Sequence, residues 1–235
     1  MKIKVVSTWN NYLYKQYARR FKKTYKWPFE LEIYNEDIDM YDKIPELKKF
    51  VDRNKITIPV SFLKDAVRFS YKVYAYTQSI LESKDYDSIM FIDADSVFYK
   101  KIDVNWIKKH LHRDECMLTY LNRPTYSECG FIYFNMKHDF IKQFATDMRK
   151  MYDKDLLFKE EQQHDSWIFD VVRKRFEDKY GILNYDIGDG RVGHVQARSI
   201  LGKIYDHTKG TRKIKGKSKE SRLWLILYQL LVMFL

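Results

Sequence analysis

Cysteine, proline and glycine are scarce in this sequence of 235 residues, which holds 2 Cys, 4 Pro and 8 Gly. Cys116 and Cys129 are too few for the disulfide framework of a small secreted domain, and their spacing is not that of a zinc site. No Gly/Ser-rich linker divides the chain and no internal repeat is visible. We therefore expect a single domain over residues 1–218 of a reduced, cytoplasmic protein.

Long apolar runs are also missing, because no run reaches the roughly 20 residues that a membrane-spanning helix needs. An apolar run at 223–235 follows a basic stretch, and together they predict a tail over 219–235 that associates peripherally with an anionic membrane surface. Packing of this tail on the domain or on a partner chain is the alternative. The start, Met1 to Thr8, has too few apolar residues for a secretory signal and predicts a strand.

Aromatic residues and positive charge are abundant. Aromatics make up 17% of the chain, which suits the half-apolar, half-hydrogen-bonding walls of a sugar cleft, although a bias towards tyrosine explains it equally well. The net charge of +11 favours an anionic partner: a nucleic acid, a nucleotide-diphosphate substrate or a membrane face.

Apolar runs alternate with helical periods along the chain. Strands are expected at residues 2–7, 31–34, 88–92, 117–121 and 130–134, and a loop at 8–11. Apolar residues at helical spacing predict helices over 14–25, 62–80, 138–152 and 160–178. The polar segment 36–59, with prolines at 45 and 59, is expected to be an irregular connection. This alternation predicts an α/β fold with one twisted, mixed, mostly parallel sheet flanked by helices.

Two carboxylates follow a strongly apolar strand. Asp93 and Asp95 come after Ser88–Ile92, whose continuous apolar character is typical of a buried parallel strand. Ligands of open α/β sheets bind beyond the carboxyl ends of strands. Two carboxylates spaced by one residue can converge there on a hard cation such as Mg²⁺ or Mn²⁺, which offsets charge on a departing diphosphate. A solvated turn with capping aspartates is the alternative.

The segment Phe91–Phe98 resembles the DxD segment of GT-A-fold glycosyltransferases, which binds the metal and the donor's diphosphate and ribose. Three further segments follow in the family's order. The first, Lys64–Lys72, lies on the helix before the DxD strand, and the resemblance implies that Arg68 and Lys72 lie near the donor. A solvated charged face is the alternative for these two side chains.

The other two segments lie downstream. Glu128–Asn135 resembles the family's strand that starts with a small residue lining the sugar pocket, here Gly130, for which a strand bulge is the alternative. Tyr205–Lys213 is similar to the late His-x-x-Gly-x-x-Lys segment of glycogenin-like transferases, although their Pro-Trp pair after the lysine is absent. This resemblance implies that His207 is a metal ligand. It also implies that Lys209, Gly210 and Lys213 contact the diphosphate.

The resemblance covers residues 1–213 and implies a GT-A fold with a nucleotide half and an acceptor half. Thr8 and Asn10, after the first strand, would then face the base. The implied cofactor is Mn²⁺ or Mg²⁺, held by Asp93, Asp95 and His207. The implied partners are a nucleotide-diphosphate sugar and a glycan or lipid-linked acceptor.

An inverting enzyme of this kind needs a general base for the acceptor hydroxyl. The family places its acceptor-side carboxylate where Gln162–Trp167 opens a helix, so we expect Asp165 to be the catalytic base, with His164 as the alternative base. A first-turn carboxylate favoured by the helix dipole is the structural alternative. In a retaining enzyme Asp165 would only position substrate.

Two rival functions remain. Asp93–Val97 also resembles the first motif of haloacid-dehalogenase-type phosphatases, with Asp93 as nucleophile, and Ile187–Gly190 is similar to their late acidic motif. However, Gly193 and His194 stand where the second aspartate of that motif would be. An RNA-binding module is disfavoured because the positive charge is spread along helices and no RRM or KH signature is present. We therefore expect no nucleic-acid partner.

Overall fold

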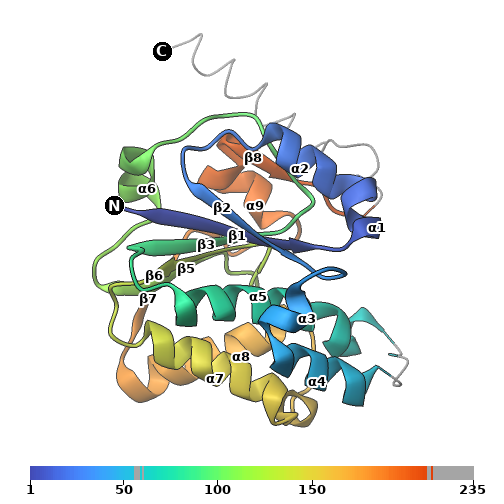
Figure 1. Ribbon diagram of the computed structural model, residues 1–235. Coiled ribbons are helices and arrows are strands. Elements are labelled where there is room, and N and C mark those ends of the chain that lie inside the picture. The colour runs from blue at the N-terminus through green and yellow to red at the C-terminus, as the bar shows by residue number, and fades with distance from the viewer. Residues whose placement is uncertain (56–58, 60, 211–212, 214–235) are drawn as a thin grey trace, which may run out of the picture.

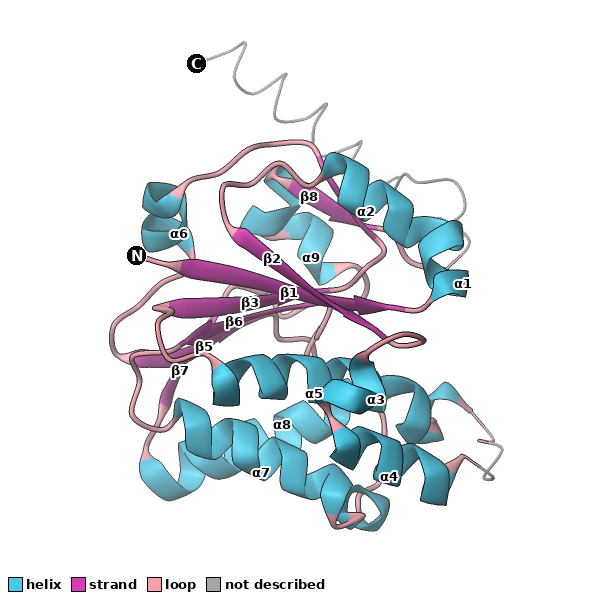
Figure 2. Cartoon of the chain, viewed as in Figure 1, coloured by secondary structure: helices cyan, strands magenta, loops and turns pink. Residues whose placement is uncertain are grey.

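A six-stranded sheet forms the centre of the computed structural model, which describes residues 1–55, 59, 61–210 and 213 (Figures 1 and 2). The strand order is β2–β1–β3–β6–β5–β7. The strands are β1 (Ile3–Trp9), β2 (Glu30–Asn35), β3 (Ser88–Ile92), β5 (Cys116–Tyr120), β6 (Phe131–Asn135) and β7 (Leu183–Asp186). β1 pairs in parallel with β2 and β3, and β5 with β7, whereas β6 is antiparallel to both neighbours. The predicted α/β class with a mixed, mostly parallel sheet is confirmed.

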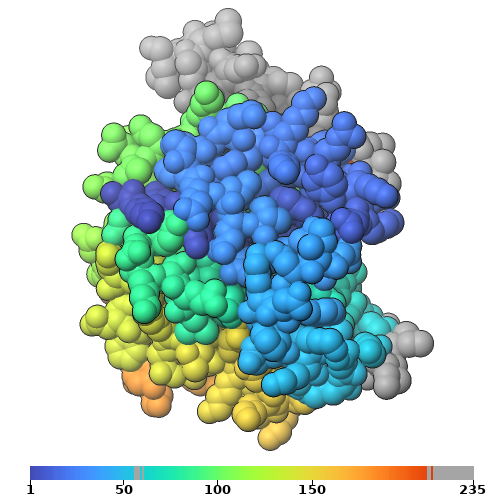
Figure 3. Space-filling view, in the orientation of Figure 1, coloured from blue at the N-terminus to red at the C-terminus, as the bar shows by residue number. Residues whose placement is uncertain are grey.

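Helices cover both faces of this sheet. The face below the sheet in Figure 1 carries α3 (Met40–Lys43), α4 (Pro45–Asn54), α5 (Ala66–Glu82), α7 (Ile141–Asp153) and α8 (Asp165–Tyr180). The face above it carries α1 (Asn11–Leu13), a π-helical turn (Tyr14–Ala18), α2 (Arg19–Thr24), α6 (Val104–His110) and α9 (Val195–Arg198). The N-terminal part of the chain, blue to cyan, covers much of the molecular face seen in Figure 3.

The apolar core is divided into two clusters by the sheet. β3 is buried at all five positions, because it lies between β1 and β6 and is covered on both faces. Ile89 and Phe91 point into the cluster under α5 and α7, whereas Met90 and Ile92 point into the cluster on the other face. This alternation explains why the strand is apolar throughout residues 89–92, as is typical of a strand covered on both faces.

Two expectations for the N-terminal part were wrong. The segment 36–59 is not irregular, since it contains α3 and α4. Pro45 is the first residue of α4, where a proline loses no helical hydrogen bond, and Leu47 and Phe50 face the core from that helix. Thr8 and Trp9 belong to β1 and not to the loop after it, because they pair with Tyr34 and Asn35 of β2.

The whole tail expected at residues 219–235, together with the domain boundary at 218, lies outside the described residues. Among the described helices, none combines the length and the apolar character needed to cross a membrane.

Candidate active site

A tight turn after β3 presents the two predicted carboxylates. The backbone N–H of Asp93 donates to the carbonyl of Gly130 (3.0 Å), and the N–H of Ser96 donates back to the carbonyl of Asp93 (3.2 Å). These bonds end the strand pairing of β3 with β6 and reverse the chain. Asp93 and Asp95 therefore lie at the carboxyl end of β3, beside the carboxyl ends of the parallel strands β1 and β2.

A small second sheet brings a distant segment to this turn. β4 (Ser96–Phe98) pairs antiparallel with β8 (Tyr205–His207), so that Ser96 lies opposite His207. Thr208 fixes the register, because its backbone N–H and its hydroxyl both donate to the carbonyl of Asp95, at 3.0 and 2.7 Å. Each strand is only three residues long, and neither was predicted from the sequence.

Asp93, Asp95 and His207 form a cluster whose ligand atoms all lie within 4.8 Å of one another. Nε2 of His207 is 2.9 Å from Oδ1 of Asp95 and 3.5 Å from Oδ2 of Asp93. Adjacent ligands of an octahedral Mg²⁺ or Mn²⁺ site are about 3 Å apart, since each lies about 2.1 Å from the ion. Oδ1 of Asp95 is buried and has no aligned hydrogen-bond donor. The orphaned oxygen and the spacing fit a divalent cation.

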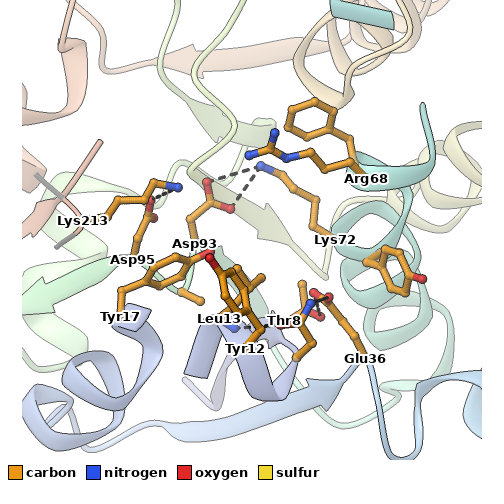
Figure 4. Close-up of a pocket in the computed structure, with 14 residues that line it drawn as sticks. Thr8, Tyr12, Leu13, Tyr17, Glu36, Arg68, Lys72, Asp93, Asp95 and Lys213 are labelled. Atoms are coloured by element: carbon orange, nitrogen blue, oxygen red, sulfur yellow. Dashed lines mark hydrogen bonds and ion pairs between the residues drawn. The ribbon is translucent and has the colours of Figure 1, made fainter. Parts of the chain in front are cut away.

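Two lysines neutralise the outer oxygens of the carboxylates. Nζ of Lys213 is 2.8 Å from Oδ2 of Asp95, and Nζ of Lys72 is 3.1 Å from Oδ1 of Asp93. Lys72 also lies 2.8 Å from Oδ2 of Asp165, the first residue of α8. Each aspartate of the cluster thus lies between His207 and a lysine, and Lys72 also lies 3.5 Å from Oδ2 of Asp93 (Figure 4 shows the lysine contacts).

The charges of the cluster shift its ionisation. Burial acts to raise the pKa of Asp95, but the charges of His207 and Lys213 outweigh it and hold this pKa well below its usual range. Burial raises the pKa of Asp93, opposed by Lys72 and His207. Burial acts to lower the pKa of His207, yet the charge of Asp95 raises it above the ordinary value. Asp95 is therefore held ionised, as a carboxylate ligand of a divalent cation must be, whereas His207 has to give up its proton before Nε2 can bind a cation.

A cavity of about 450 Å³ opens beside these carboxylates. Seven of the predicted site residues line it: Thr8, Asn10, Arg68, Lys72, Asp93, Asp95 and Lys213 (Figure 4). The cavity wall is built from segments that are far apart in sequence. They are β1 with the loop after it, α5, and the turn after β3. α5 begins here because the side chain of Asp65 caps it by accepting from the N–H of Arg68 (3.1 Å).

The other predicted residues lie elsewhere and, in the described part of the chain, do not line the cavity. His207 is buried behind the two aspartates, and Asp165 is buried against Lys72. Lys209 contacts the carboxylate of Glu128, and Gly210 is exposed with a left-handed φ of 56°. Gly130 faces His207, because a Cβ on this residue would lie 2.3 Å from Cε1 of that ring.

Some lining residues were missed by the sequence analysis. They are Tyr12, Leu13, Tyr17, Glu36, Phe69, Tyr71 and Ala94. Glu36 follows β2 and accepts hydrogen bonds from Oγ1 of Thr8 (3.1 Å) and Nδ2 of Asn10 (3.0 Å). Burial raises the pKa of Glu36 to about 7, although both hydrogen bonds act to lower it. Its place directly after a strand parallel to β1 was the signal that could have identified it.

The acidic motif of the phosphatase alternative is separate from the cavity. Oδ2 of Asp189 is 2.6 Å from Nε of Arg198, and in the described part of the chain Asp189 does not line the cavity. This pairing gives Asp189 a structural role in its loop and leaves Asp93 without the second acidic group of that motif.

Comparisons with known proteins give a fold likeness only. No family model and no curated protein matches the chain. Among solved structures, a glycosyltransferase involved in the glycosylation of the major capsid of PBCV-1 matches with a TM-score of 0.49 at 8% identity, covering 96% of this chain and 100% of that one. The glycosyltransferase GlyE of Streptococcus pneumoniae TIGR4 matches with a TM-score of 0.48 at 14% identity, covering 80% of this chain and 46% of that one. Mouse xyloside xylosyltransferase 1 has a TM-score of 0.48 at 8% identity, with 80% and 86% covered. Likeness at this level does not assign a function.

Proposed function

We propose that this chain is a divalent-metal-dependent glycosyltransferase that uses a nucleotide-diphosphate sugar as donor. The observation that carries the proposal is the convergence of Asp93, Asp95 and His207, of which the two aspartates line the cavity and His207 lies behind them. The sequence resemblance assigned these three residues to one metal site, although His207 lies more than a hundred positions downstream. Their spacing and the orphaned oxygen of Asp95 support that assignment.

Asp93, Asp95 and His207 would hold the metal ion. An imidazole among carboxylates favours Mn²⁺ over Mg²⁺, which prefers an all-oxygen shell. When bound, the ion supplies positive charge that offsets the charge of the departing diphosphate. The shell has two carboxylates and one neutral donor, so it leaves positions for phosphate oxygens.

The cavity offers distinct surroundings for the parts of a nucleotide-diphosphate sugar. Arg68 and Lys213 place positive charge beside the carboxylates, where they would contact the diphosphate. Tyr12 is 68% exposed and lies next to the polar groups of Thr8 and Asn10 along the cavity wall. Such an exposed ring, beside hydrogen-bonding groups, suits the base and ribose of the donor.

The general base stays a prediction. Asp165 is the proposed acceptor of the proton from the acceptor hydroxyl, and the start of α8 holds it close to Lys72. Its side chain is only 5% exposed, so an acceptor hydroxyl reaches the carboxylate only after a local rearrangement. In a retaining reaction Asp165 would instead position substrate through Lys72. A glycan or lipid-linked hydroxyl is the proposed acceptor.

The test is a thermal-shift screen of nucleotide sugars with Mn²⁺ and with EDTA. A ligand that binds only the folded chain raises its melting temperature by mass action. We expect at least one nucleotide sugar to stabilise the protein in Mn²⁺ and none to do so in EDTA. Stabilisation that is independent of the metal would refute the metal-dependent site. Trapping of a phosphoryl group on Asp93 would instead support the phosphatase alternative.

A further inference from the structure

A buried glutamate lies on the far side of the His207 ring from the metal cluster. Glu128 is 5% exposed and, among the described residues, is not part of the cavity wall. Oε1 of Glu128 is 3.8 Å from Nδ1 of His207, whereas Nε2 of the same ring faces Asp93 and Asp95. Nδ1 is itself buried and has no hydrogen-bond partner. The ring thus has carboxylates on both of its nitrogen sides.

The two oxygens of Glu128 face different groups. Oε2 contacts Nζ of Lys209 and lies 3.2 Å from Nη1 of Arg123. Oε1 accepts the backbone N–H of Gly130 (3.2 Å) and is the oxygen on the His207 side. These contacts fix the carboxylate beside the ring.

Gly130 makes the approach of the ring to Glu128 sterically possible. A Cβ at this position would lie 2.3 Å from Cε1 and 2.6 Å from Nδ1 of His207, and 3.0 Å from Oε1 of Glu128. Any side chain here would force the imidazole away from its place. The backbone of His207 is also fixed, because Nε2 of His194 lies 2.7 Å from its carbonyl oxygen.

We propose that Glu128 is a positioning residue that orients the imidazole of His207 through its Nδ1 side, so that Nε2 faces the metal site. The inference rests on the proposed function, because it needs His207 to be a metal ligand. A carboxylate beside the second ring nitrogen of a ligating histidine favours the tautomer that carries its proton on that nitrogen. At 3.8 Å the contact of Oε1 with Nδ1 is electrostatic and longer than a hydrogen bond. Glu128 thereby acts through His207 and does not touch the metal or the substrate.

The test is a Mn²⁺ titration of the full chain, with free Mn²⁺ followed by its EPR signal and without any nucleotide. Glu128→Gln keeps the shape and removes the charge, and we expect Kd for Mn²⁺ to rise about 10–100-fold. In the His207→Ala background the same substitution should change Kd by less than about two-fold, because it acts through the missing ring. Pulsed EPR should detect nitrogen coordination to Mn²⁺ in the unaltered chain and less of it in Glu128→Gln.

Two further variants separate positioning from stability. Glu177→Gln removes a carboxylate paired with the buried Arg173 at 2.6 Å, away from the cluster, and should leave Kd for Mn²⁺ unchanged. Gly130→Ala should weaken Mn²⁺ binding by displacing the His207 ring, and this loss should disappear in the His207→Ala background. An unchanged Kd in Glu128→Gln, or an equal loss with and without His207, would overturn this inference alone. Absence of Mn²⁺ binding by the unaltered chain would overturn it together with the proposed metal site.

Discussion

Replacing Asp95 by asparagine is the sharpest perturbation of the cluster. The amide keeps the shape of the side chain but removes the charge that faces His207 at 2.9 Å and Lys213 at 2.8 Å. Lys213 is 32% exposed and His207 can lose its proton, so we expect a stability cost of only about 1–3 kcal/mol. At 2–4 °C per kcal/mol for a domain of this size, the melting temperature falls by roughly 2–12 °C and the fold persists.

The effect on Mn²⁺ should be far larger than the effect on the fold. Loss of a directly coordinating carboxylate should weaken Mn²⁺ binding at least about 100-fold, since supporting residues alone cost 10–100-fold. At a Mn²⁺ concentration of about 100 times Kd the unaltered chain gains about 2.7 kcal/mol, or roughly 5–11 °C. In Asp95→Asn the same concentration gives about 0.4 kcal/mol, near 1 °C.

The control is Asp189→Asn, which breaks a pair with Arg198 outside the cavity and should keep the full Mn²⁺-dependent shift. Equal Mn²⁺-dependent shifts in Asp95→Asn and in the unaltered chain would refute the metal assignment.

Four further predictions follow from the site and the sequence. His207→Ala should raise the Mn²⁺ concentration needed for half-maximal turnover more than it lowers stability, whereas overlapping Mn²⁺ titrations would exclude ligation. Asp165→Asn should lower kcat by roughly 10²–10⁴-fold at unchanged donor affinity, and a defect confined to donor binding would exclude a base. Burial raises the pKa of Glu36 from 4.5 to about 7, so the free energy of unfolding should fall as pH rises from 4.5 to about 7, by at most about 3 kcal/mol, and level off above that. Chemical denaturation of Glu36→Gln across pH 4–8 should show a flatter profile. Finally, the full chain should float with anionic vesicles while a chain ending at Ser218 should not, and equal behaviour of the two would refute a membrane-surface tail.

The longer elements could be predicted from local pattern. The strand expected at 88–92 and the helix expected over 62–80 follow from a buried apolar run and from a 3.6-residue period. Both are present, although the helix spans Ala66–Glu82 and a separate 3-10 turn occupies Phe62–Lys64. The short strands β4 and β8 could not be predicted, because three residues carry no readable period and their pairing joins segments far apart in sequence. α4 was missed because Pro45 was interpreted as a break, although proline at the first helical position begins a helix.

The site residues that lie in sequence motifs could be predicted. The Asp-x-Asp pair and the late His-x-x-Gly-x-x-Lys segment led to Asp93, Asp95 and His207, which the structure brings together. Glu36 lies in no motif, and Glu128 opens a segment in which only Gly130 was given a role, so their positions beside the cavity and beside His207 became visible only from tertiary packing. The contact of Lys72 with Asp165 was likewise hidden, because it joins helices α5 and α8.

The most direct test of the proposed function is the product released from nucleotide sugars. The full chain would be incubated with UDP- and GDP-sugars and Mn²⁺, and nucleoside diphosphate and inorganic phosphate would be measured separately, with Asp95→Asn alongside. Because no acceptor is added, the sugar passes to water. We predict that nucleoside diphosphate and free sugar accumulate from at least one donor, that EDTA or Asp95→Asn stops this, and that no inorganic phosphate forms. Release of inorganic phosphate, or nucleoside diphosphate formation that survives both EDTA and Asp95→Asn, would contradict the proposed function.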